Sequence, residues 1–117
     1  MKITLNKCYG AFHPSHLCIL RYCELANITI YPHSTDWGGH FYTLEASPDS
    51  EPFNEFDIPR TSSALAQAVE ELGEDASSPG SELVTRNIEE GQQYRILEYD
   101  GTEWLEFPSD ITWEIAT

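Results

Sequence analysis

Residues 94–107 read Tyr-Arg-Ile-Leu-Glu-Tyr-Asp-Gly-Thr-Glu-Trp-Leu-Glu-Phe, and this stretch predicts a β-hairpin. Asp100-Gly101 is a favoured residue pair for the two-residue type I′ turn between antiparallel strands. A hairpin centred there places Glu98 opposite Glu103. One face of the hairpin then carries Tyr94, Ile96, Leu105 and Phe107, which suits a core. The hairpin is therefore expected to pack this face on a core, with Leu97, Trp104 and the Arg95–Glu106 ion pair on the other face.

Shorter signals on either side of the hairpin predict the remaining elements. Strands are expected at residues 2–5, 28–31, 40–46 and 82–88, where β-branched or alternating apolar residues gather. A first helix is expected over residues 16–25, capped by Ser15 and closed by Asn27. A second helix is expected after Ser62 or Ser63, with one apolar face formed by Leu65, Val69, Leu72 and Ala76. Gly73 is an alternative end for this helix, and residues 111–116 are a candidate last strand.

This order, β-α-β-β-α-β-β-β, predicts an α+β fold in which two helices pack on a mainly antiparallel sheet. The length of 117 residues predicts a single domain over 1–117. Residues 47–60 are rich in proline and acidic residues, and they predict an exposed acidic loop. Aromatic side chains make up 12% of the chain, which supplies a core and distinguishes it from an acidic disordered chain.

The charge is distributed unevenly along the chain. Residues 1–33 carry three basic groups and one acid, whereas residues 34–117 hold nearly all the acids of a chain with net charge −14. Such an excess repels nucleic acid and membrane surfaces and attracts basic partners. The chain has no run of about eighteen apolar residues, so no membrane span is predicted. Its start lacks a secretory signal, and its three cysteines form no disulfide framework.

Several acidic residues occupy positions where they are expected to add nothing to folding. Acids at the C-terminal end of a helix oppose its dipole, and like charges directly across a strand pair repel one another. We therefore interpret the acids as a partner-binding surface. Its expected members are Glu70, Glu71, Glu74, Asp75, Glu89, Glu90, Glu98, Asp100, Glu103 and Glu106. Trp37, in the segment His-Ser-Thr-Asp-Trp-Gly-Gly-His at residues 33–40, is expected to be an aromatic anchor of that surface.

Other chemistries are less well supported by the sequence. The Glu98–Glu103 pair could act as acid and base or bind a cation. His13 and His16 with Cys18 or Cys23 lack the paired spacings of a zinc site. Cys8 lies beside Lys7, which would favour a thiolate nucleophile, but no partner histidine is specified. We therefore predict no catalytic residue, no cofactor and no metal.

Three blocks of sequence resemble a family of small, uncharacterised proteins of tailed phages and prophages. They are residues 1–10 (Met-Lys-Ile-Thr-Leu-Asn-Lys-Cys-Tyr-Gly), residues 58–74 from Ile-Pro-Arg-Thr to Val-Glu-Glu-Leu-Gly-Glu, and residues 98–103 (Glu-Tyr-Asp-Gly-Thr-Glu). The chain departs from the family at Ala11, at Ser62-Ser63 and in lacking a basic C-terminal end. The resemblance implies a viral or prophage origin, and it implies no settled activity.

The leading hypothesis is a non-enzymatic inhibitor of the anti-CRISPR or other anti-defence type. In this hypothesis a DNA-mimicking acidic face binds a basic, nucleic-acid-binding surface of a host defence complex. The protein itself is expected to bind neither nucleic acid nor membrane, and to act in the host bacterial cytoplasm. One alternative is a binding protein for a signalling nucleotide that uses the basic residues Lys2, Lys7 and Arg21. The other alternative is a small enzyme that uses Cys8.

Overall fold

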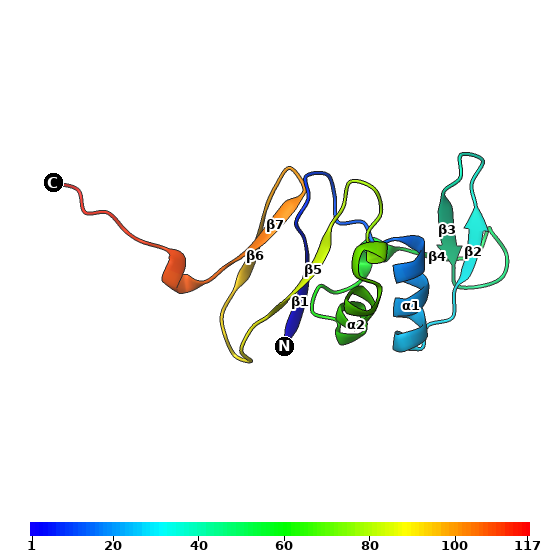
Figure 1. Ribbon diagram of the computed structural model, residues 1–117, viewed down its shortest axis with the longest axis horizontal. Helices are drawn as coiled ribbons and strands as arrows, with labels where there is room; N and C mark the ends of the chain where they lie inside the picture. Colours follow the sequence, from blue (N-terminus) through cyan, green and yellow to red (C-terminus); the bar gives the residue numbers. More distant parts are fainter.

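A computed structural model describes all residues, 1–117, and shows two helices between small antiparallel sheets (Figure 1). The α+β class is confirmed. The strands are β1 (Lys2–Asn6), β2 (Tyr31–Ser34), β3 (His40–Thr43), β4 (Pro52–Phe53), β5 (Leu83–Asn87), β6 (Arg95–Tyr99) and β7 (Thr102–Glu106). The helices are α1 (His16–Ala26) and α2 (Ser63–Leu72), with short 3-10 turns η1 (Glu55–Asp57), η2 (Gly73–Ala76) and η3 (Pro108–Asp110). Neither helix has the length and apolar character needed to cross a bilayer.

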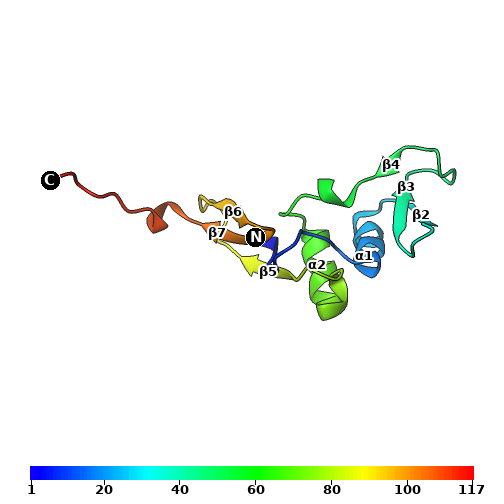
Figure 2. The ribbon, with the colours of Figure 1, turned by 90° about the horizontal axis from the view of Figure 1, so that it is seen from above.

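The strands form three separate sheets rather than one continuous sheet. β1 pairs with β5, β6 pairs with β7, and β2, β3 and β4 form a third sheet in that order. The two helices lie side by side between the β1–β5 pair and the β2–β3–β4 sheet, as both views show (Figures 1 and 2). The hairpin β6–β7 lies beyond the β1–β5 pair, so the layers follow one another along the long axis of the molecule.

The helix boundaries follow from the caps that the sequence predicts. Ser15 caps α1 by accepting a hydrogen bond from the amide of Cys18 at 3.1 Å, and Asn27 closes the helix in the left-handed region, with φ of 57°. Ser62 caps α2 in the same way. Gly73, with a positive φ of 57°, ends α2, so Ala76 reaches the core from η2 rather than from the helix.

Two apolar clusters hold the layers together. The larger cluster lies between the helices and the third sheet, and its buried members include Phe12, Ile19, Tyr42, Leu65 and Val69. The smaller cluster lies between the β1–β5 pair and the hairpin, and consists of Ile3, Leu5, Ile88 and Leu105. Tyr94, Ile96 and Phe107 pack against it, which confirms the predicted core-facing side of the hairpin.

The hairpin register also agrees with the prediction. Glu98 lies opposite Glu103, and both Asp100 and Gly101 have positive φ, as a type I′ turn requires. Gly101 packs directly on the backbone of Gly10, so closely that a Cβ atom would overlap the Gly10 carbonyl. The turn therefore needs glycine both for its backbone conformation and for this contact.

Three predictions of local structure were wrong. The strand expected at 28–31 lies at Tyr31–Ser34 and includes Pro32, which an edge strand tolerates because no ladder bond is lost. Residues 47–60 are not simply a loop, because they contain β4 and η1. Residues 111–116 form no strand. Figure 1 shows this segment leading away from the body beyond η3, and Trp113 is 88% exposed.

The side chain of Asn6 joins three segments that are distant in sequence. It is fully buried at the end of β1. Its amide nitrogen donates to the carbonyls of Cys8 at 2.9 Å and Gly101 at 2.8 Å. Its oxygen accepts from the amides of Cys8 and Glu82, at 3.2 and 2.9 Å, and from the Ser81 hydroxyl. The first turn, the start of β5 and the hairpin turn are thus fixed to one carboxamide.

We expect Asn6→Ala to lower the free energy of unfolding by about 2–4 kcal/mol, because it leaves several partly buried backbone groups without partners and a cavity at a fully buried position. The control is Asn87→Ala at the exposed end of β5, expected to change stability by no more than about 0.5 kcal/mol. Urea unfolding followed by circular dichroism measures both. Equal losses in the two variants would contradict the role given to the Asn6 side chain.

Candidate acidic interface

Four of the six lysine and arginine side chains form ion pairs within the protein. Each pair joins elements that are separate in the fold or lies across the hairpin. The pairs are Lys2–Glu70, Arg21–Glu71, Arg60–Glu103 and Arg95–Glu106. Lys7 and Arg86 are the two cations without a carboxylate partner. Most of the positive charge is therefore neutralised internally, and most of the remaining acids have no lysine or arginine partner.

The expectation that Glu70 and Glu71 add nothing to folding was wrong. Lys2 donates to Glu70 at 2.6 Å across the β1–α2 contact, and hydrogen bonds from Lys2 and Thr85 lower the pKa of Glu70. Arg21 of α1 donates to Glu71 of α2 at 2.6 Å. Hydrogen bonds from Arg21 and Gln67 lower the pKa of Glu71 to about 2. Both acids link α2 to its neighbours, although the pairs are exposed and each contributes little.

The paired acids of the hairpin have different partners. Glu103 accepts a hydrogen bond from the backbone amide of Asn6 at 2.9 Å and forms an ion pair with Arg60. The Arg60 guanidinium carbon in turn lies 3.4 Å from the centre of the Phe12 ring. Glu98 turns the other way and accepts from the amide of Gly101 at 2.6 Å. Separate hydrogen bonds to the two carboxylates thus offset the repulsion predicted between them. Glu103 contributes to the stability of the fold through its contacts with Asn6 and Arg60.

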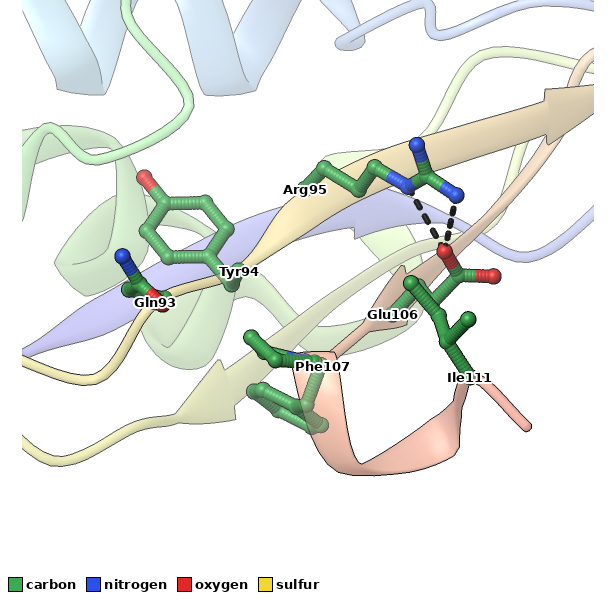
Figure 3. A pocket seen from close by; sticks show the side chains of 7 residues that line it. Gln93, Tyr94, Arg95, Glu106, Phe107 and Ile111 are labelled. Carbon is green, nitrogen blue, oxygen red and sulfur yellow. Dashed lines mark hydrogen bonds and ion pairs between the residues drawn. The ribbon is translucent and has the colours of Figure 1, made fainter. Parts of the chain in front are cut away.

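Glu106 lies at the edge of a small cavity beside the hairpin (Figure 3). Arg95 donates to it from Nε at 2.6 Å, so the two charged groups of the cavity are paired with each other. The cavity has a volume of about 240 Å³, and it is lined by Gln93, Tyr94, Arg95, Glu106, Phe107, Pro108 and Ile111. We interpret it as the open end of the smaller apolar cluster.

Six of the sixteen acids outside the four ion pairs lie along one edge of the molecule, and the other ten lie elsewhere. Figure 1 shows the turns at 35–39, 77–82 and 100–101 spaced along this edge, with the loop at 7–10 between the last two and η2 on the same side of α2. We call this the acidic edge, and its carboxylates are those of Asp36, Glu74, Asp75, Glu82, Glu98 and Asp100. Trp37 lies on the same edge and is 85% exposed. Glu89 and Glu90 lie in the turn between β5 and β6, which Figure 1 places at the opposite edge.

The alternative sites gain no support from the structure. Lys2 and Arg21 are tied to carboxylates, which leaves Lys7 as the free cation of the basic N-terminal third. The Cys8 thiol makes no hydrogen bond. Cys18 and Cys23 are buried in the larger cluster, where burial raises the pKa of each thiol to about 11. No group of three or more histidine, cysteine or acidic side chains is arranged to hold a metal ion.

The structure also brings together histidines that the sequence does not connect. The imidazole rings of His16 and His40 stack at 3.8 Å with an angle of 8° between their planes. His16 Nδ1 lies 2.8 Å from the Tyr42 hydroxyl. Burial and the neighbouring His40 lower the pKa of His16, so its ring is neutral at neutral pH. The contact forms because β3 packs beside the start of α1, which no local sequence signal predicts.

Comparisons with protein-family models, with curated proteins and with solved structures found no match to this chain.

We expect Glu103→Gln to lower the free energy of unfolding by about 1–3 kcal/mol, because it removes the charge that pairs with Arg60 next to a buried backbone amide. Glu98→Gln, at the opposite position of the same strand pair, retains an acceptor for Gly101. It is expected to change stability by less than about 0.5 kcal/mol. Chemical denaturation of both variants tests the assignment. It is wrong if Glu98→Gln is the more damaging change.

We expect the protein to lose stability as the pH falls from about 7.5 to about 5. The unfolded chain protonates His16 near its usual pKa of 6.5, whereas the folded protein, with a lower His16 pKa, takes up this proton less readily. Acid therefore favours the unfolded state. Thermal melts should show a smaller loss in His16→Gln than in the parent, with the exposed His13→Gln as control. An unchanged pH dependence in His16→Gln would refute this explanation.

Proposed function

We propose that this protein is a non-enzymatic inhibitor whose acidic edge occupies a basic, nucleic-acid-binding surface of another protein. The observation that carries the proposal is the pairing of charge. Four of the six cations are neutralised by internal ion pairs. The carboxylates of the acidic edge form no ion pair with these four cations, on a chain of net charge −14. Lys7 is the free cation of this edge, because its backbone is hydrogen-bonded to Glu82 and to Thr102.

The physical basis is competition for the same cations. Proteins that bind nucleic acid neutralise phosphates with lysine and arginine side chains. Carboxylates held on rigid turns can occupy those side chains, and the loss of freedom on binding is small because the turns are already ordered. The Asn6 and Glu98 hydrogen bonds order the hairpin turn in this way. Trp37 supplies an exposed aromatic anchor at the same edge.

The biological form of the proposal rests on the resemblance to proteins of tailed phages and prophages. A mobile element gains from blocking a host defence complex, and such complexes expose basic channels for nucleic acid. We therefore propose an anti-CRISPR or related anti-defence role in the host bacterial cytoplasm. The proposed partner is a host protein or nucleoprotein complex, and direct binding of nucleic acid by this chain is disfavoured by its charge.

The proposal predicts that partner binding weakens at high salt concentration and that it requires the carboxylates of the acidic edge. The tagged protein is used to capture its host complex at about 50 mM and about 500 mM salt, and capture should fall steeply at the higher value. The double variant Glu74→Gln/Asp75→Asn removes two charges from the acidic edge and should weaken binding about three- to tenfold.

The matched control, Glu89→Gln/Glu90→Gln, removes the same charge from exposed positions at the opposite edge. It should leave the affinity within about twofold of the parent. Capture that is independent of salt would refute the charge-mimic mechanism. Equal weakening by the two double variants would show that net charge, rather than the acidic edge, determines binding.

A further inference from the structure

A cavity of about 460 Å³ lies at one end of the acidic edge. It is formed where the start of α1, the turn between β2 and β3, η1 and the loop at residues 78–79 meet. Its lining is aromatic and polar, and it consists of His13, Pro14, His16, Ile19, Trp37, Gly38, Gly39, His40, Tyr42, Glu55, Ser78 and Pro79. A volume of this size accommodates a side chain or a small ligand.

Flat π-systems form much of the wall. The stacked rings of His16 and His40 are continued by Tyr42, whose ring centre lies 5.7 Å from that of His16. Trp37 stands at the cavity with most of its indole in solvent. Such surfaces favour a planar group that can stack on them.

The charged residues of the lining determine whether a cationic or an anionic group would bind in the cavity. Glu55 is the one carboxylate among the lining residues, and no lysine or arginine is present. Its side chain is 18% exposed, lies 3.8 Å from His13 Nε2, and is positioned by η1, which Asn54 caps. His16 adds no opposing charge at neutral pH. An anionic group would therefore meet an acidic site, whereas a cation would meet a carboxylate.

We infer that this cavity binds the guanidinium group of an arginine side chain on the partner. Guanidinium is planar, stacks on aromatic faces and presents a fork of donors to a carboxylate. Lysine lacks the flat face. The inference rests on the function proposed above in one respect, namely that the arginine belongs to the basic surface of the partner. It names the partner group that Trp37 and Glu55 would recognise.

The test is an NMR titration of the isolated protein with N-acetyl-L-arginine amide. Resonances of Trp37, Gly39 and His40 should shift in a saturable manner. The neutral analogue N-acetyl-L-citrulline amide has nearly the same shape and should leave them in place. Glu55→Gln should weaken arginine binding about tenfold. The control Asp57→Asn removes a charge from the same 3-10 turn, outside the cavity lining, and should keep the parent affinity within about twofold.

A second pair of variants tests the stacking surface. Trp37→Ala should weaken binding about fivefold, whereas Trp113→Ala, at an equally exposed position in the C-terminal segment, should have no effect. Equal shifts with the citrulline analogue would overturn the inference, as would shifts of the same resonances by adenosine monophosphate. Arginine binding without capture of a host complex would refute the proposed function alone. Salt-dependent capture without arginine shifts would refute the cavity assignment alone.

Discussion

The buried carboxamide of Asn6 is the interaction on which the rest of the structure depends. This uncharged group at the end of β1 forms hydrogen bonds with the backbone of the first turn, of the start of β5 and of the hairpin turn. Both of its polar atoms therefore have partners. The hairpin held in this way positions Glu103 to accept a hydrogen bond from the Asn6 amide and to form an ion pair with Arg60. The Arg60 guanidinium in turn stacks on the Phe12 ring of the larger cluster. Polar contacts therefore connect two apolar clusters that do not merge. The turns that carry Glu82 and Asp100 are held in place by a residue that contributes no charge to the acidic edge.

The excess of acidic residues is compatible with a stable fold because most of the few cations pair with carboxylates that would otherwise repel one another. Lys2, Arg21, Arg60 and Arg95 each meet a carboxylate at a junction between elements or across the hairpin. Each exposed pair contributes little by itself. Together they neutralise positive charge, and they link α2 to β1 and α1, and the hairpin to Arg60. The acids at the C-terminal end of α2 consequently divide into two groups, with Glu70 and Glu71 serving the fold and Glu74 and Asp75 facing solvent.

The sequence predicted what depends on neighbouring residues. Ser15, Asn27 and Ser62 set the helix ends, and Asp100-Gly101 sets the hairpin register, because each acts on backbone groups close in sequence. Features that depend on tertiary packing were missed. β4 forms only because β3 is beside it, and the segment at 111–116 has strand character but no partner. The stack of His16 on His40 and the cavity beside it join segments that carry no shared local signal.

The pairing of β1 with β5 has a consequence for the order in which the chain can fold. The Asn6–Glu103 hydrogen bond spans 97 positions, and closing so long a loop before any contact forms is entropically costly and slow. Local elements such as α1, α2 and the hairpin need no such closure. During synthesis Ile3 and Leu5 leave the ribosome long before their partners in β5 and β7 exist. β1 is thus made well before the strands that cover it, and its apolar side chains remain open to chaperones or to misassembly until β5 and β7 have been made.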